Sequence, residues 1–415
     1  MIVSAGTACA AFFARPRIYG LFLMGAYVAT VGFAVLGTLV KPNPWKLLDW
    51  LISYAGGFVR RGLFGEAAFG LQRLTGLGVD LSVMAVQLGS YGLLFWGLWR
   101  LAEALPDRRP ALWLLYAPFV ALFQIADWTG GFRKEVLLLA VVAVLAVRLA
   151  RAGEAGVFAA TVGALALAPL LILGHEMLAL YLPYALVPLA VVRWTPGRVA
   201  VIAGLLAASA LAFGAALMHP GDAETARAIC AQVAAEGPLP PVLVNCAAAD
   251  NPIVWLARSS ADGAGLVAEL LPLFARELPL ALALMGLALL PLWPALVQAP
   301  HARALAAAAG VSLLATLPLF AVAVDWGRFL YVHGVCLALM ALALVARSGA
   351  RPNAAGWRIW LVGLLVPIYA LGWSLTHTDG VLGRGAPVEI AARLLGGPAA
   401  SLVPQDLSRP LAPAD

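Results

Sequence analysis

The sequence predicts an all-α integral membrane protein with about eleven transmembrane helices, and three observations lead to this class. Of the 415 residues, 63 % are hydrophobic and only 12 % are charged, and the mean hydropathy is +0.92. A soluble domain carries about 25 % charged residues, because its surface faces water. Apolar runs long enough to cross a bilayer also recur along the whole chain. Together these features exclude a soluble enzyme, a disordered chain and a secreted disulfide-rich scaffold.

Eleven apolar runs meet or approach the length of about 20 residues that a helix needs to cross a bilayer core. They lie at residues 19–40, 81–103, 110–126, 135–152, 155–174, 177–193, 198–218, 278–297, 303–324, 329–347 and 357–375. We therefore expect residues 1–375 to form one polytopic transmembrane domain and residues 376–415 to form an outer tail. Within that tail, residues 387–396 have the pattern of an amphipathic surface helix.

The positions of Lys and Arg predict the orientation of these helices. Short loops rich in basic residues stay in the cytoplasm. With Arg15 and Arg17 inside, the inner loops hold thirteen basic residues against three acids. This distribution predicts a bacterial inner-membrane protein with a cytoplasmic N-terminus and a periplasmic C-terminus. The outer side then contains a first loop at 41–80 and a long loop at 219–277.

The long outer loop contains two of the four cysteines, Cys230 and Cys246, sixteen positions apart. Disulfides form in oxidising compartments such as the periplasm, so the sequence predicts a bridge between them. The alternative is a pair of unpaired loop thiols. Cys9 and Cys336 lie in apolar sequence and are expected to be small packing residues.

The first outer loop combines acidic, basic and aromatic residues in the stretch LLDWLISYAGGFVRRGLFGE. It contains Asp49, Trp50, Tyr54 and the adjacent pair Arg60 and Arg61. Basic residues on an outer loop oppose the topological trend, which indicates a local function. The planar guanidinium can donate two parallel hydrogen bonds to a phosphate. The alternative is an amphipathic interfacial helix whose arginines contact lipid head groups.

Three further outer turns each bring an acid and a base together, and two of them contain Asp-Trp: DWTGGFRKEV, GHEM and DWGRF. They contribute Asp127, Trp128, Arg133 and Lys134, then His175 and Glu176, and finally Asp325, Trp326 and Arg328. The sequence thus predicts that acids and bases from separate turns converge in one cavity on the outer face. The alternative is a structural network of ion pairs that holds helix ends together.

The chemistry that these residues can perform is glycosyl transfer from a lipid-phosphate donor. The acids Asp49, Asp127, Glu176 and Asp325, together with His175, are candidate bases, and the acids are also candidate ligands of a divalent cation. The arginines and Lys134 are candidate phosphate ligands. The aromatic residues Trp50, Tyr54, Trp128 and Trp326 offer flat surfaces to sugar rings.

This arrangement resembles multi-pass bacterial glycosyltransferases of the GT-C class and the O-antigen polymerase group. In those enzymes an acid follows the first span and outward arginines hold a lipid diphosphate, which Asp49 and the pair Arg60–Arg61 would match. The resemblance implies an outward active site, a polyprenyl-linked sugar or glycan as substrate and membrane lipids as surroundings. It implies no nucleic-acid partner.

Two other functions remain open from the sequence. One is a transporter or flippase of lipid-linked sugars, although transporters place ionisable residues near the bilayer midplane and often contain repeats. The other is a non-catalytic protein of cell-envelope assembly. The clustering of acids, bases and aromatic residues on one face favours the transferase.

Overall fold

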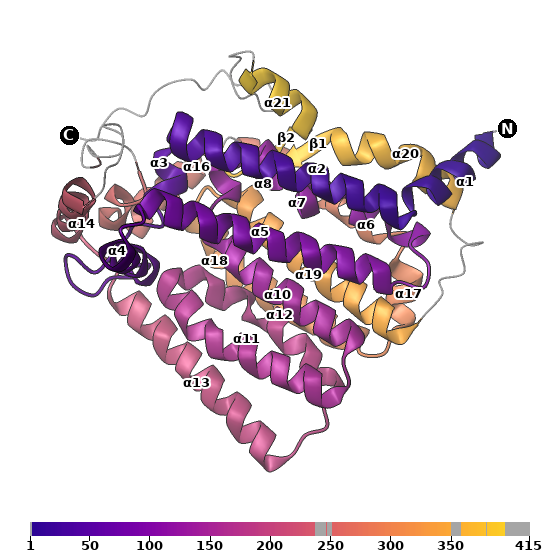
Figure 1. Ribbon diagram of the computed structural model, residues 1–415, viewed down its shortest axis with the longest axis horizontal. Helices are drawn as coiled ribbons and strands as arrows, with labels where there is room; N and C mark the ends of the chain where they lie inside the picture. The colour runs from indigo at the N-terminus through magenta and orange to yellow at the C-terminus, as the bar shows by residue number, and fades with distance from the viewer. Residues whose placement is uncertain (1, 237–245, 247–250, 350–357, 379, 395–415) are drawn as a thin grey trace.

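The computed structural model describes residues 2–236, 246, 251–349, 358–378 and 380–394, and most of this part is helical (Figure 1). Within it, seven helices are long and apolar enough to cross a membrane. They are α2 (Pro16–Val35, continued by the π-helical η1, Leu36–Val40), α5 (Val79–Ala104), α11 (Glu154–Gly174), α13 (Pro196–Met218), α16 (Ser260–Leu289), α18 (Ala302–Val322) and α19 (Trp326–Ser348). The protein is thus an all-α membrane protein.

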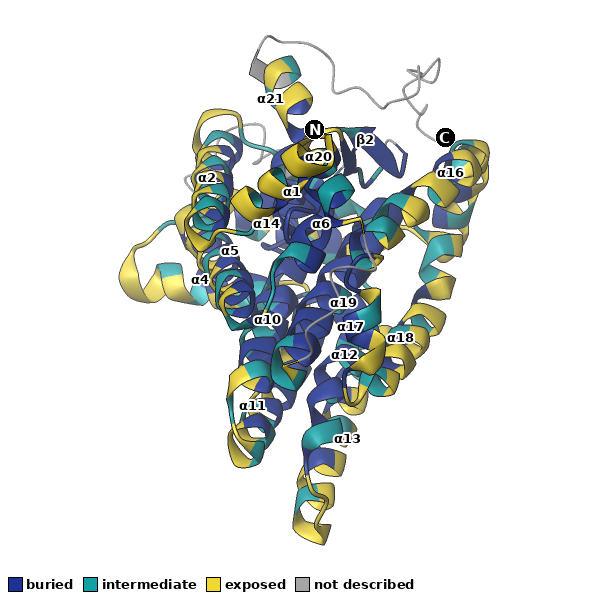
Figure 2. Ribbon diagram, turned by 90° about the vertical axis from the view of Figure 1, so that its right-hand side faces the viewer, coloured by how far each residue is buried: buried dark blue, intermediate teal, exposed yellow. Residues whose placement is uncertain are grey.

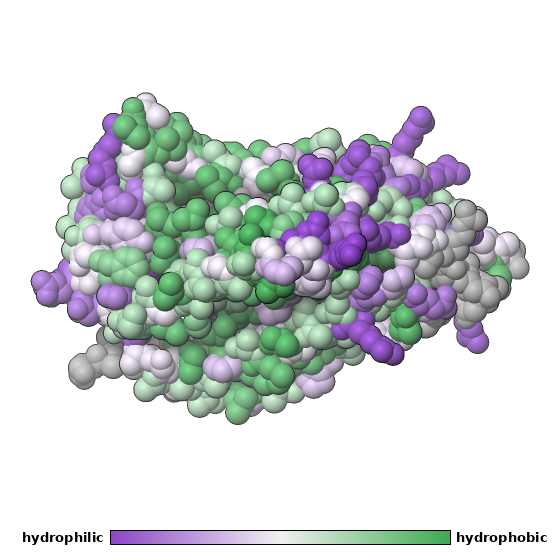
Figure 3. Space-filling view, turned by 90° about the horizontal axis from the view of Figure 1, so that it is seen from below, coloured by the Kyte–Doolittle hydropathy of each residue, from purple (hydrophilic) through white to green (hydrophobic). Residues whose placement is uncertain are grey.

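Helix α19 lies in the centre of the molecule, beside α10 (Glu135–Arg151) (Figures 1 and 2). Almost every residue of α19 is buried, whereas α13, α16 and α18 expose leucines such as Leu211, Leu280 and Leu314. Figure 3 shows hydrophobic residues across the middle of one face and hydrophilic residues toward its two ends. This distribution is the one expected of a protein whose middle faces lipid.

Two predicted spans are each divided into several short elements. Residues 110–126 form η2 (Arg109–Ala111), α6 (Leu112–Leu115), α7 (Pro118–Ala121) and α8 (Phe123–Ala126). Pro118 disfavours helical geometry at Ala117, whose ψ is 130°. Residues 177–193 form the 3₁₀ segments η3 (Glu176–Tyr181) and η4 (Val187–Val191) around α12 (Leu182–Leu186). Residues 110–126 are buried throughout, as irregular backbone at membrane depth requires.

The segment expected to form the long outer loop, 219–277, includes the first part of helix α16. Helix α16 begins at Ser260, where the side chain of Ser259 accepts a hydrogen bond from the Asp262 backbone and Asp262 reaches back to Ser259. This reciprocal cap starts the helix well before the most apolar residues. The predicted span 278–297 therefore divides between the end of α16 and the short α17 (Trp293–Gln298).

The shorter elements lie around this bundle. Helix α1 (Ile2–Phe13) packs along α20 (Ile359–Leu371), where a Cβ on Gly6 would lie 2.2 Å from the carbonyl oxygen of Trp360. The first outer loop contains α3 (Pro44–Leu47) and α4 (Leu63–Thr75). The remaining short helices are α9 (Trp128–Gly131), α14 (Ala223–Glu236) and η5 (Val254–Ala257).

The chain after α20 forms a small hairpin and a helix. Strands β1 (Trp373–Leu375) and β2 (Leu382–Arg384) pair antiparallel, with Trp373 opposite Arg384. Helix α21 (Ala386–Leu394) occupies the stretch for which the sequence predicts an amphipathic helix. The rest of the predicted tail, 395–415, lies outside the described residues.

The contacts sort the helix ends into two groups. Arg151 at the end of α10 donates to the carbonyl of Arg100 in the last turns of α5, and Arg347 at the end of α19 donates to the carbonyls of Leu149 and Ala152. The opposite ends of α10 and α19 begin at Glu135 and Trp326. The basic inner loops of the predicted topology thus gather at one end, and the acid–base turns gather at the other.

Candidate functional site

A cavity of about 740 Å³ lies where several of the turns that were predicted to be outer meet. Its polar lining includes side chains from all the turns selected in the sequence: Arg60, Arg61, Asp127, Arg133, Glu176, Asp325 and Arg328. The ends of α13 and α18 and the starts of α16 and α19 complete it. The structure therefore brings together residues that are more than 250 positions apart in the chain.

Arg61 and Glu176 form a close ion pair in the cavity wall. The guanidinium donates from Nη2 to Glu176 Oε1 at 2.6 Å and from Nε to both carboxylate oxygens at 3.0 Å. Arg60 approaches the same carboxylate at 3.7 Å, beyond hydrogen-bond distance. Within the described part of the chain, the side chain of Arg60 makes no hydrogen bond. The guanidinium of Arg61 is thus occupied by its hydrogen bonds to Glu176, whereas the guanidinium of Arg60 keeps donors that can bind an anion.

Asp49 lies behind the cavity wall, fully buried, with its Oδ2 3.4 Å from Nε of Arg133. Burial raises the pKa of Asp49, but the charges of Arg133 and Lys134 outweigh it and hold the pKa well below its usual range. Burial lowers the pKa of Lys134 to about 8, and its Nζ donates to the carbonyl of Arg61 at 3.0 Å. The geometry favours a positioning role for Asp49 and Lys134.

Arg133 contacts Asp49 on one side and the ring of Trp45 on the other, at 5.3 Å from the ring centroid. Its side chain makes no hydrogen bond with any residue that the structure describes, although it is only 3 % exposed. A buried guanidinium without hydrogen-bond partners is costly unless a ligand supplies them. Arg133 and Arg60 are therefore the arginines most available to phosphate.

A second string of charges runs from His175 to Asp325. Glu135 Oε1 lies 3.7 Å from His175 Nε2 and 3.5 Å from Arg328 Nη1, and Arg328 Nη2 donates to Asp325 Oδ2 at 2.6 Å. His175 is fully buried and does not line the cavity. Burial and the charge of Arg61 lower the pKa of this imidazole. Glu135 is the centre of this chain of charged residues, and the sequence analysis does not predict it as a site residue.

Asp127 has a partner that the sequence did not indicate. Its Oδ2 accepts from the backbone N–H and from Nδ1 of His377, at 2.8 and 2.7 Å, and its Oδ1 accepts from the N–H of Gly130. His377 lies 250 residues further along the chain and also lines the cavity. Sequence reasoning missed it because no local motif surrounds His377.

The structure places the predicted aromatic platforms elsewhere. Trp50 is buried and donates to the carbonyl of Phe132, Trp326 stacks on Phe274 at 4.5 Å, and Tyr54 stacks on Phe58 at 5.3 Å. All three pack against protein because neighbouring aromatic rings fill the space around them. The side chain of Trp128 lies outside the described residues.

Two other tryptophans line the cavity, Trp45 and Trp255, with ring centroids 6.1 Å apart. The sequence does not single out Trp45, because no pair of an acid and a base adjoins this residue in the stretch KPNPW. Arg258 lies over the ring of Trp255 and is exposed at the same edge. Trp45 and Trp255 thus line the cavity, whereas Trp50, Tyr54 and Trp326 do not.

The cavity lining also includes many apolar side chains. They are Leu180, Phe213 and Leu217, Leu266 and Leu270 of α16, and Leu319 and Val322 of α18. Helices α13, α16 and α18 also expose leucines on the surface of the protein. The cavity thus combines charged side chains with apolar side chains from these three helices.

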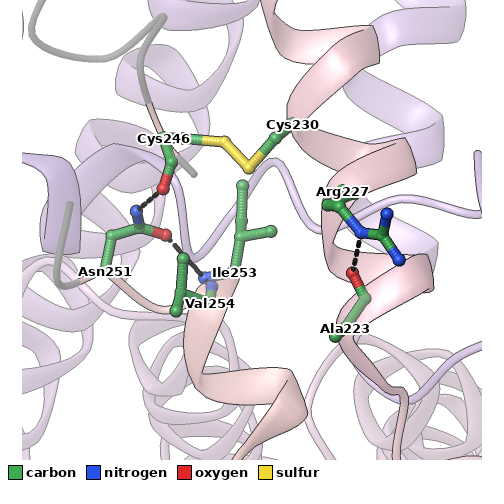
Figure 4. Close-up of a disulfide and its surroundings, with 7 residues drawn as sticks. All are labelled: Ala223, Arg227, Cys230, Cys246, Asn251, Ile253 and Val254. Carbon is green, nitrogen blue, oxygen red and sulfur yellow. Dashed lines mark hydrogen bonds between the residues drawn. A yellow bond between two sulfur atoms is a disulfide. The ribbon is translucent and has the colours of Figure 1, made fainter. Parts of the chain in front are cut away.

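A disulfide joins Cys230 of α14 to Cys246, with Cα atoms 5.7 Å apart (Figure 4). Asn251 donates to the carbonyl of Cys246, and its Oδ1 accepts from the backbone N–H of Ile253. The disulfide therefore anchors the segment that leads to Trp255 at the cavity.

In the described ranges, no group of three or more His, Cys, Asp and Glu side chains is arranged to hold a metal ion. The expected acids are instead divided among separate arginine and histidine partners. Comparison with protein families, with characterised proteins and with solved structures finds no match to this chain.

Proposed function

We propose that the protein is a membrane glycosyltransferase or polysaccharide polymerase that uses polyprenyl-phosphate-linked sugars at the outer face of the inner membrane. The observation that carries this proposal is the mixed lining of the cavity. Arg60 and Arg133 contribute positive charge to it, and α13, α16 and α18 contribute apolar side chains. A substrate with an anionic head and a long apolar tail matches this combination.

The size of the cavity also suits such a head group. A volume of about 740 Å³ lies within the range of about 300–1,000 Å³ that is typical of small-molecule sites. A diphosphate and one sugar ring are of that order. The tail is expected to leave between the peripheral helices and enter the lipid.

The transfer step uses charges that are already in place. When the bond between the sugar and the phosphate breaks, negative charge grows on the departing phosphate oxygen. Fixed guanidinium groups in a buried cavity stabilise that charge more than water does, because they need no reorganisation. Arg61 and Arg328, held by Glu176 and Asp325, keep the cavity wall in place around Arg60 and Arg133.

The test is binding and transfer by the purified protein in lipid nanodiscs. The probes are polyprenyl diphosphate for binding and a radiolabelled sugar on polyprenyl diphosphate for transfer to a lipid-linked acceptor. Arg60→Lys and Arg133→Lys should weaken binding by about tenfold or more, because Lys lacks the planar fork. Arg73→Lys on the exposed part of α4 is the matched control and should bind like wild type.

Two outcomes would contradict the proposal. If all three variants bind polyprenyl diphosphate equally well, Arg60 and Arg133 are not phosphate ligands. Specific binding without any label transfer would refute the transferase and favour movement of lipid-linked sugars across the membrane.

A further inference from the structure

We infer that His377, held by Asp127, is the general base that accepts the proton of the attacking sugar hydroxyl. This inference rests on the proposed function and adds a residue to its site. The pair lines the same cavity as Arg60 and Arg133.

The geometry fixes which imidazole nitrogen is available. A carboxylate can only accept hydrogen bonds, so Nδ1 of His377 carries the proton that it donates to Asp127 Oδ2 at 2.7 Å. In the neutral imidazole the other nitrogen, Nε2, is then the unprotonated one. Among the described residues it has no hydrogen-bond partner. An imidazole whose first nitrogen is held by a buried carboxylate is oriented for proton transfer at the second.

The acids selected from the sequence are less suited to this role. Glu176 accepts three close contacts from Arg61, and Asp325 accepts one from Arg328 at 2.6 Å. The charge of Arg328 outweighs the effect of burial and lowers the pKa of Asp325. Asp49 is behind the wall. A carboxylate neutralised by a guanidinium is a weak base, whereas a neutral imidazole has a basicity near operating pH.

The turns DWTGGFRKEV and DWGRF both make room for the His377 segment. A Cβ on Gly130 of DWTGG would lie 2.9 Å from Cγ of His377, and a Cβ on Gly327 of DWGRF would lie 1.8 Å from the carbonyl oxygen of Thr376. The hairpin is anchored from the other side, because Oε2 of Glu277 accepts from the N–H groups of Val381 and Leu382. Three separate elements therefore position one histidine.

The proposed step balances in atoms and electrons. The hydroxyl oxygen of the acceptor forms a bond to the anomeric carbon while its proton moves to Nε2. The bond from that carbon to the phosphate oxygen breaks, and its electron pair stays on the phosphate beside Arg60 and Arg133. The imidazolium, stabilised by Asp127, then returns its proton to water. No oxidant, reductant or further reactant is needed.

The test variant is His377→Asn, whose amide N–H can replace Nδ1 as donor to Asp127 while nothing replaces Nε2. It should reduce kcat by about 10²–10⁴-fold and leave the binding of polyprenyl diphosphate unchanged. His301→Asn is the control, because His301 precedes α18 at the end opposite to Val322. Twenty residues of helix separate it from the cavity by about 30 Å.

The pH profile separates a base from a structural residue. A general base must be unprotonated to accept a proton, so wild-type activity should fall as the pH is lowered, and His377→Asn should lose this acidic limb.

The failure of this inference differs from the failure of the proposed function. If His377→Asn transfers sugar at the wild-type rate, or keeps the acidic limb, His377 is not the base and the transferase stands. If the wild-type protein transfers no sugar, the proposed function fails and the role of His377 fails with it.

Discussion

At the residue scale, the buried charged side chains of this protein form ion pairs and chains of neighbouring ion pairs. Arg61 adopts a left-handed backbone conformation with φ of 68°, which residues other than glycine seldom adopt. This strained residue holds Glu176 with two nitrogens. Strain that persists at a cavity wall indicates that the surrounding contacts determine the conformation. The contacts on either side of Arg61 therefore matter more than its own backbone preference.

Glu135 is the residue whose removal should cost the most stability. It is 2 % exposed and is shared by His175 and Arg328. Glu135→Ala would leave Arg328 with one buried partner fewer, and breaking such a pair typically costs about 3–5 kcal/mol. We expect a clear fall in the thermal unfolding midpoint of the detergent-solubilised protein. Glu66→Ala, which breaks the exposed pair with Arg73, is the control and should unfold like wild type. Equal midpoints for both variants would refute the role of Glu135.

At the element scale, the turns are positioned by close contacts of backbone with backbone. DWGRF opens α19, the most buried of the seven long helices, and its glycine lies against Thr376 at the end of strand β1. The local sequence identifies DWGRF as a turn before a helix. It cannot identify Thr376 as the neighbour, because that contact joins segments almost fifty residues apart.

Gly327→Ala should therefore impair the site without unfolding α19. The added methyl group would lie 1.8 Å from the carbonyl oxygen of Thr376, so the segment carrying His377 has to move. We expect a loss of transfer similar to that of His377→Asn, with polyprenyl diphosphate binding retained. Gly310→Ala in α18 is the matched control, because no atom lies within 4 Å of its added Cβ. Its activity should equal that of wild type, and its stability should rise slightly, since alanine favours helix. Wild-type activity in Gly327→Ala would show that this contact does not position the site.

At the scale of the whole molecule, the sequence predicts what depends on composition and misses what depends on packing. Long apolar runs became the seven long helices, and Arg61, Glu176 and Arg328 meet at one cavity. The breaks in residues 110–126 follow from Pro110 and Pro118. The high hydropathy of this stretch predicts one continuous helix and hides the effect of the two prolines. The partners of Asp127 and Glu135 could not be predicted, because each joins distant segments. The orientation in the membrane and the count of eleven crossings remain predictions.

The last prediction concerns that orientation. Arg109 and Arg198 belong to the basic group of loops, whereas Glu224 is exposed on α14 near the disulfide. Single cysteines introduced at these positions, with Cys9 and Cys336 changed to alanine, should react differently with a membrane-impermeant maleimide. Positive loops stay inside, so Glu224→Cys should label in intact spheroplasts, and Arg109→Cys and Arg198→Cys should label only after the membrane is opened. Labelling of Arg198→Cys in intact spheroplasts would invert the topology. The cavity would then face the cytoplasm, where nucleotide-linked sugars are available, and a lipid-linked donor would no longer be required.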